Sequence, residues 1–379
     1  MKTLHYIPIL IILFLSACTS DETLTPPEPD GQGNVTFLFT AGSEITTRTE
    51  LNSPKNLQHV EKVHLYIFKG IGDAATCEQV KELPWPKPGD VNYATTTRTY
   101  SILLPSGDYT FLAIGLDDKS GTTYDLPAAI AVGSTLADAK AVLAIGQTKT
   151  DIAQSELFAG SAEAIGVTES GNAAVTINLW RRVAGMLGYF KNAPSGTSKI
   201  QITLYTQQNG SGYLLKQEVE NEEYPFGIKN PKNFIDYITS PVSPNNEDKT
   251  VVSIAVPAGT DAATILSGGS YLLPIAAPPI VDGETEYTLL VELVGADGIT
   301  VNKTIKVKMK EGDDLYNDPT GAGSGIIDIS GPFRYPIVAN RLYTIGTALA
   351  PVDLGDDGSS DIVITVNPDW DWKDNIEWQ

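Results

Sequence analysis

The sequence has very few of the side chains on which most enzymes and metal sites depend. It holds 3 histidines and 2 cysteines in 379 residues. His5 lies in an N-terminal apolar segment, and His59 and His64 stand beside a predicted strand, where a surface or strand-edge position is a simpler interpretation than a metal pair. So little histidine excludes most nucleophile–base chemistry and most zinc sites. We therefore predict no enzymatic activity, no cofactor and no metal.

The chain also lacks an excess of basic residues, and its two cysteines are not expected to pair. A formal net charge of -20 argues against nucleic acid as a partner, because phosphates demand a basic surface. If Cys18 is chemically modified, as argued next, Cys77 has no partner and no disulfide stabilises the fold. Stability must then come from a buried core, and the length suggests two domains.

The N-terminus predicts export and a lipid anchor. The apolar run from Ile7 to Leu15 is too short to span a bilayer but has the length of a signal-peptide core, so we expect residues 1–17 to be removed. Leu15-Ser16-Ala17-Cys18 is similar to a bacterial lipobox, in which the cysteine is acylated and anchors the protein to membrane lipid. The alternative is an ordinary secretory signal followed by a chance cysteine.

A tether and one short strand follow the anchor. Residues 23–33 read TLTPPEPDGQG, which is typical of an extended linker. Val35, Phe37 and Phe39 then alternate with polar or smaller residues, the period of a strand with one buried face. Farther on, Arg48 and Thr49 lie in a polar stretch that a trypsin-like protease can cut, although from local sequence alone a solvated loop arginine is the simpler interpretation.

The rest of the chain predicts a β-sandwich fold with one short helix. Residues 98–104 and 109–116 are expected to form a hairpin around the turn at 105–108, and residues 134–143 a helix that begins at a capping hydroxyl. Many further short strands are separated by Gly, Pro, Asn and Asp. We place an N-terminal domain at 49–179 and a C-terminal domain at 180–379.

The C-terminal region offers one strand and two weaker site candidates. Ile362, Ile364 and Val366 form a period-two apolar face like that of the first strand. The acidic loop 353–361 lacks the residue order of a calcium loop, so a solvated connection is favoured over calcium binding. The tail also contains three tryptophans that suit either sugar stacking or structural packing, the second being favoured: Trp370, Trp372 and Trp378.

Taken together, the order and spacing of these pieces resemble the Bacteroidales major fimbrillin family, the FimA/Mfa-like subunits of type V pili. The segments that carry the resemblance are the lipobox at Cys18, the strand ending at Thr40 with Arg48 after it, the segment TLADAKAVL after Ser134, SELFAG at 155–160, Arg182-Val183, the segment NRLYTI at 340–345 and the tail ending in Glu377-Trp378. The sequence departs from the best-known members at Thr49, where those have a small apolar residue.

The resemblance implies two tandem transthyretin-like β-sandwich domains with one or two short helices, and an outer-membrane lipoprotein precursor cut after Arg48. Residues 18–48 would be a propeptide containing a removable strand (Val35, Phe37, Phe39). A donor strand (Ile362, Ile364, Val366) within about 340–379 of a neighbouring subunit would replace it. The implied partners are other fimbrial subunits, an Arg-specific protease, outer-membrane lipid and host or bacterial surface ligands.

Two functions remain open at this point. The first is a shaft or tip subunit of a surface fimbria that supports adhesion. The alternative is a surface lipoprotein of the outer membrane that binds glycans through β-sandwich domains and never polymerises.

Overall fold

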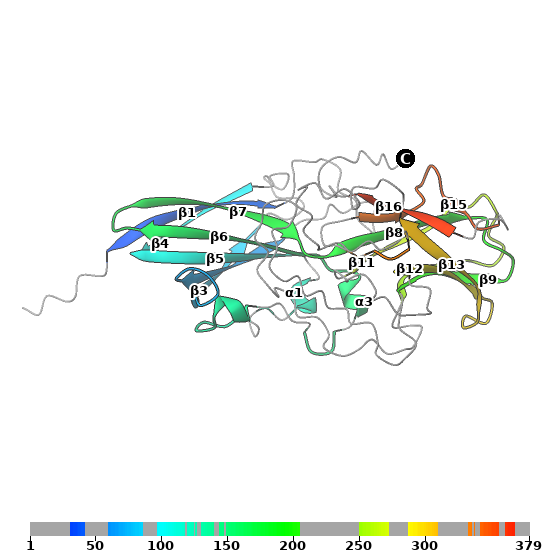
Figure 1. Ribbon diagram of the computed structural model, residues 1–379, viewed down its shortest axis with the longest axis horizontal. Helices are drawn as coiled ribbons and strands as arrows, with labels where there is room; N and C mark the ends of the chain where they lie inside the picture. Colours follow the sequence, from blue (N-terminus) through cyan, green and yellow to red (C-terminus); the bar gives the residue numbers. More distant parts are fainter. Residues whose placement is uncertain are drawn as a thin grey trace, which may run out of the picture.

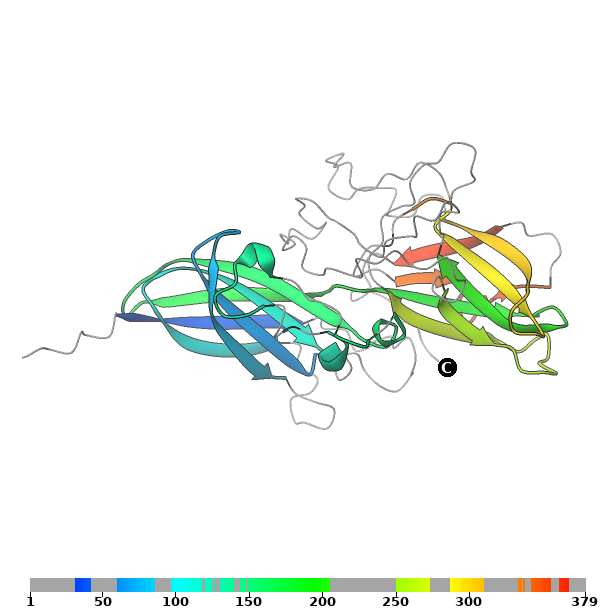
Figure 2. The ribbon, with the colours of Figure 1, turned by 90° about the horizontal axis from the view of Figure 1, so that it is seen from below.

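The fold consists of two bodies of β-structure placed end to end. A computed structural model describes residues 31–41, 60–85, 97–117, 120–124, 126, 130–139, 144–147, 149–204, 250–272, 287–309, 333–335, 337, 342–355 and 361–367. The two bodies follow one another along the longest axis of the molecule (Figure 1 and Figure 2). The prediction of a mainly β protein with tandem sandwich domains is confirmed.

The first body is a sandwich of two layers. Its strands are β1 (Gln32–Ala41), β2 (Lys62–Lys69), β3 (Thr76–Pro84), β4 (Thr97–Pro105), β5 (Gly107–Leu116), β6 (Leu157–Val167) and β7 (Asn172–Arg181). They follow the order β3-β2-β5-β6-β7-β1-β4. β6 and β7 share only the pairs Phe158↔Arg181 and Ala159↔Trp180, so the layers β3-β2-β5-β6 and β7-β1-β4 meet at that corner. A Cβ at Gly160 would lie 2.0 Å from the carbonyl oxygen of Asn178, which explains a glycine where β6 comes close to β7.

Alternating apolar residues of both layers form the core of this sandwich. The side chains that β1, β2, β5 and β7 bury in it are Val35, Phe37, Phe39, Val63, Leu65, Ile67, Tyr109, Phe111, Ala113, Val175, Ile177 and Leu179. Successive residues of a strand point to opposite faces, so this period of two places one face of each strand inside.

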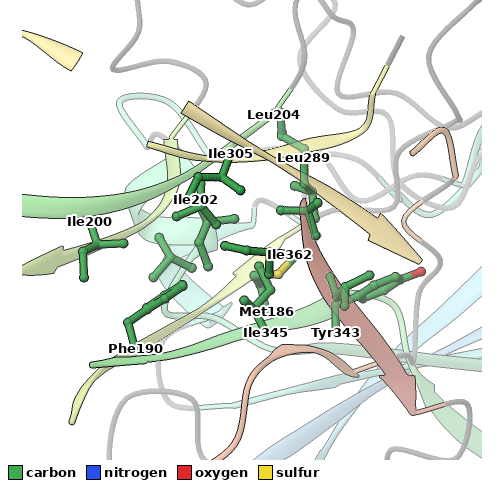
Figure 3. Close-up of a cluster of buried hydrophobic side chains, with 14 of the residues drawn as sticks. Met186, Phe190, Ile200, Ile202, Leu204, Leu289, Ile305, Tyr343, Ile345 and Ile362 are labelled. Carbon is green, nitrogen blue, oxygen red and sulfur yellow. The ribbon is translucent and has the colours of Figure 1, made fainter. Parts of the chain in front are cut away.

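The second body is one curled nine-stranded sheet. Its strands are β8 (Ala184–Lys191), β9 (Thr197–Leu204), β10 (Thr250–Ala255), β11 (Leu266–Leu272), β12 (Leu289–Gly295), β13 (Val301–Met309), β14 (Leu342–Ile345), β15 (Val352–Asp353) and β16 (Asp361–Asn367). Their order is β10-β9-β12-β13-β16-β14-β8-β11, and β15 pairs with β8. The two halves of this sheet enclose a second core that includes Phe190, Ile202, Leu289 and Ile362 (Figure 3).

The predicted hairpin over residues 98–116 is wrong, although both of its strands exist. β4 pairs with β1, and β5 pairs with β2 and β6, so the two strands belong to opposite layers. The turn between them is a corner that crosses the sandwich, held by the Tyr109 hydroxyl, which donates to the Pro105 carbonyl at 2.9 Å. A local turn signal specifies the change of direction and does not specify the partner of each strand.

The predicted helix over residues 134–143 shortens to one 3₁₀ turn, η1 (Leu136–Asp138), and residues 140–143 lie outside the described part. The backbone before the turn is engaged by β3, because Cys77 N donates to Ser134 O at 2.9 Å and Leu136 N donates to Ala75 O at 2.8 Å. At Ala139 the backbone is already extended. Within the described residues there are two other short helices, α1 (Ser120–Thr123) and α3 (Lys149–Ile152).

A third apolar cluster joins the two bodies. The first body contributes Tyr66, Phe68, Leu112, Ile114 and Leu157 among others, and the second contributes Val183, Leu187, Tyr189, Tyr271 and Leu342. β7 ends at Arg181 and β8 begins at Ala184, so the chain passes between the bodies through two residues. Tyr271 N also donates to Ala153 O at 3.1 Å, which links the bodies through their backbones.

Candidate functional site

β1 lies in the interior of the layer β7-β1-β4 and uses both of its edges. It pairs in parallel with β7 and antiparallel with β4, so that Phe37 stands between Val175 and Tyr100. Because both edges are hydrogen-bonded, removing β1 would leave unpaired backbone groups on two neighbouring strands. The result would be a slot the width of one strand.

The three residues predicted to face the core do so. Val35, Phe37 and Phe39 are fully buried. The ring of Phe37 packs edge-on against Phe111 of the opposite layer, with centroids 4.8 Å apart, and stacks on Phe39 at 5.7 Å. β1 therefore fills the middle of the first core.

β16 has the same kind of neighbours as β1. It pairs in parallel with β13 and antiparallel with β14. Its residues Ile362, Ile364 and Val366 are buried, whereas Val363 and Thr365 are exposed. The two strands thus share a period-two apolar face and the same arrangement of one parallel and one antiparallel partner.

β16 is nevertheless an integral strand of its own domain. Ile362, Ile364 and Val366 all belong to the second core, where Ile362 lies among Met186, Ile345 and Ile202 (Figure 3). If this strand paired with another subunit instead, it would first have to leave that core. The sequence pattern did not reveal this cost, because a period of two does not say which sheet a strand joins.

The residues predicted for lipidation and cleavage lie outside the described residues. These are Cys18, Arg48 and Thr49. Arg48 follows β1 in the chain by seven residues, since β1 ends at Ala41. A cut after it would separate β1 from everything that follows, because the next described strand is β2.

The start of the acidic loop is engaged in structural contacts. Asp353 accepts hydrogen bonds from Asn192 Nδ2 at 2.8 Å and from Gly355 N at 3.0 Å, and its carboxylate lies 3.5 Å from Lys191 Nζ. These donors lower the pKa of Asp353, and the Asn192 hydrogen bond is the largest cause. Residues 356–360 lie outside the described part, as do Trp370, Trp372 and Trp378. Among the described residues, no group of three His, Cys, Asp or Glu side chains could hold a metal ion.

A buried ion pair at the junction was not anticipated from the sequence. The Arg181 guanidinium donates to the Glu156 carboxylate, and both side chains are buried. Glu156 N in turn donates to the Asp117 carboxylate at 2.6 Å. The signal that could have indicated it is the presence of charged residues at the ends of otherwise apolar strands. The pair fixes the end of β7 beside the start of β6.

Comparison with known protein families identifies the family of this chain. The family described as "Fimbrillin-A associated anchor proteins Mfa1 and Mfa2" matches residues 26–376. The chain belongs to this family. The resemblance seen in the sequence is thereby confirmed at the level of the fimbrillin family.

Solved structures of fimbrial proteins from Porphyromonas gingivalis are similar to this chain. The tip fimbrial protein Mfa3, solved with a C-terminal truncation, has 12% identity and a TM-score of 0.38, over 88% of this chain and 98% of that one. The fimbrial anchor protein Mfa2 has 10% identity and a TM-score of 0.37, over 88% and 98%. No curated protein sequence matches the chain. None of the helices within the described residues is long and apolar enough to cross a membrane.

Proposed function

We propose that this protein is a structural subunit of a surface fimbria that supports adhesion, exported as a precursor acylated at Cys18 and polymerised by strand exchange after a cut behind Arg48. The observation that carries the proposal is the position of β1. This strand fills the first core through Val35, Phe37 and Phe39, yet it lies on the far side of Arg48 from the rest of the domain. Membership of the fimbrillin-associated family supports the same role.

The energetics of β1 explain why a cut subunit would polymerise. Each of the three buried side chains contributes about 1.5 to 3 kcal/mol. Their sum is comparable with the whole stability margin of a domain, about 5 to 15 kcal/mol. A subunit that has lost β1 therefore exposes an apolar slot and unpaired strand edges, and binding a strand from a neighbour restores both.

The strand that would fill the slot is β16 of another copy. Its apolar residues Ile362, Ile364 and Val366 follow the spacing of those in β1, and it pairs with one parallel and one antiparallel neighbour in its own sheet. The same two orientations are offered by β7 and β4. Because β16 has to leave its own core, the exchange is favourable only when the slot of β1 is open. Cleavage thus controls assembly.

The decisive experiment is to determine the N-terminus of the protein on cells, together with an Arg48→Ala variant. Wild type is expected to begin at Thr49 and to form ladders that resist SDS, whereas Arg48→Ala is expected to stay folded and uncut, with acylated Cys18, and to form no such ladder. Arg48→Lys is the matched control, because it keeps the charge and blocks only an Arg-specific protease. Polymer from Arg48→Ala would contradict the role of cleavage.

A second candidate is a lipid-anchored subunit that keeps β1. Two observations favour it: the family description names anchor proteins, and β16 is built into its own core. In that case the protein on cells would retain acylated Cys18 and β1 throughout, and other subunits would assemble on it. The N-terminus measurement therefore separates the two candidates.

A further inference from the structure

Among the residues that the structure describes, the outer face of the layer β7-β1-β4 carries no ionisable side chain. Twelve residues form the middle of this face, of which nine are exposed and three are half-exposed. They are Asn34, Thr36, Leu38, Thr40, Thr97, Thr99, Ser101, Leu103, Asn172, Ala174, Thr176 and Asn178. We call this surface the neutral face. The layer that presents it lies at one end of the molecule, with β1 and β7 side by side (Figure 1).

The charges of these three strands all point away from the neutral face. β4 has one charged residue, Arg98, whose guanidinium lies over the ring of Trp85, 5.8 Å from its centroid. β7 has one, Arg181, which is buried against Glu156. By contrast β3, the edge strand of the opposite layer, carries Glu78, Lys81 and Glu82. Proteins commonly protect edge strands with such charges, and β4, which ends the order of described strands, has none on its outward side.

We propose that the neutral face is a contact surface for a second copy of this chain. The protein has a net charge of -20, so two copies repel one another over most of their surfaces. The neutral face adds no charge to that repulsion, and depletion of charge is also what distinguishes the centre of protein interfaces.

The hydrogen-bonding groups of the neutral face are self-complementary. Hydroxyl and amide groups are both donors and acceptors, so the same groups can pair across a two-fold axis. Two leucines stand out from this polar surface, Leu38 with 41% and Leu103 with 58% of their area exposed. None of these twelve residues is aromatic.

The size of the neutral face makes each contact weak. Three strands about 4.8 Å apart and roughly seven residues long give about 350 Å² per copy. A pair would bury about 700 Å², below the 1,200 to 2,000 Å² of stable interfaces. Many such contacts made side by side bind more strongly than one. In this chain that repetition rests on the proposed polymer, which would present many copies of the face. If β16 replaces β1, its exposed residues Val363 and Thr365 add no charge to the middle of the face.

The test uses the full precursor carrying Arg48→Ala, because this variant keeps β1 and needs no strand exchange. A failure of the proposed contact can therefore be told apart from a failure of polymerisation. Sedimentation equilibrium up to millimolar concentration is expected to show a weak dimer that strengthens as salt rises, because salt screens the repulsion. Thr99→Glu with Ser101→Glu is expected to weaken the dimer at least tenfold. Ser253→Glu with Ser267→Glu, exposed positions of the second sheet, adds the same charge and is expected to leave it unchanged.

Charge rescue completes the test. Mixing the Thr99→Glu, Ser101→Glu protein with a Thr99→Lys, Ser101→Lys protein is expected to restore association beyond wild type, whereas the lysine variant mixed with wild type is not. Three results would overturn the proposal: a monomer at every concentration, equal weakening by both glutamate pairs, or retention on a neutral polysaccharide column that the face variant loses. The last would assign the face to a glycan.

Discussion

At the scale of single residues, the buried polar groups are more informative than the exposed charges. The pair Arg181–Glu156 is removed from water, so its two members depend on each other. Cys77 is a buried free thiol whose pKa is raised by burial, and it therefore behaves as a small apolar residue of β3. His64 is a buried residue of β2, and histidine is the side chain whose ordinary pKa lies closest to physiological pH.

His64 predicts a loss of stability on mild acidification. Burial lowers its pKa below 6.5, more than Glu82 at 3.8 Å raises it, and Lys62 lowers it further. The unfolded chain therefore binds a proton more readily, so stability is complete above about pH 6.5 and falls as the pH drops toward the lowered folded value. Thermal unfolding at pH 5.0 and 7.5 should show a smaller difference for His64→Gln than for wild type. An identical difference would contradict this assignment.

At the scale of elements, β1 and β16 are the two strands whose placement decides the proposed mechanism. Each lies inside a sheet and buries three apolar side chains in a core. Neither is a loose appendage, so exchange must be driven by the removal of one of them. This makes the stability contributed by each strand the quantity to measure.

The first element-scale prediction concerns the core side of β1. Phe37→Ala in the uncut precursor is expected to reduce the free energy of unfolding by about 3 to 5 kcal/mol, because it leaves a cavity beside Phe111. Leu38→Ala, one residue along on the exposed side, is the matched control and should cost less than about 1 kcal/mol. Urea unfolding of both variants measures the difference. Similar costs for the two would mean that β1 does not sit in the core.

The second element-scale prediction separates β16 from the residues that follow it. A chain ending at Leu354 lacks β16, so we expect it to lose both polymer and much of the stability of the second domain. A chain ending at Asn367 keeps β16 and is expected to fold and polymerise. Ladder formation on SDS gels and thermal melts measure both properties. Loss of polymer from the Asn367 chain would place the donor in residues 368–379 and not in β16.

At the scale of the whole molecule, the two bodies share one apolar cluster and a two-residue connection. Leu187 illustrates how this arises: its neighbour Met186 points into the second core, and Leu187 points to the cluster that also contains Tyr66 and Leu112. β8 is thus buried on both faces. The two bodies therefore bury apolar surface against each other.

The junction predicts that the two domains unfold together. Leu187→Ala is expected to lower stability by about 2 to 5 kcal/mol and to split one calorimetric transition into two, because it removes packing between the bodies. Leu349→Ala, which alters a side chain with 95% of its area exposed, should leave the trace unchanged. A single, equally cooperative transition in the Leu187→Ala protein would show that the cluster does not couple them.

The sequence was sufficient for features that depend on local periodicity. The sequence predicts one strand with a buried face from Val35, Phe37 and Phe39. It predicts another from Ile362, Ile364 and Val366. Both predictions hold because side chains alternate with a period of two whatever the partner strand is. The scarcity of histidine and the charge of -20 likewise constrained the class of protein without any structure. The landmark segments in their order were enough to indicate the family.

Only the tertiary structure decided which strands are partners. β4 and β5 are adjacent in sequence and joined by a tight turn, yet they pair with β1 and β2 in opposite layers. β16 proved to be part of its own core, and the segment before η1 gave its backbone hydrogen bonds to β3. The physical reason is the same in each case: strand pairing and core packing join residues far apart in sequence, and local patterns carry no information about that choice.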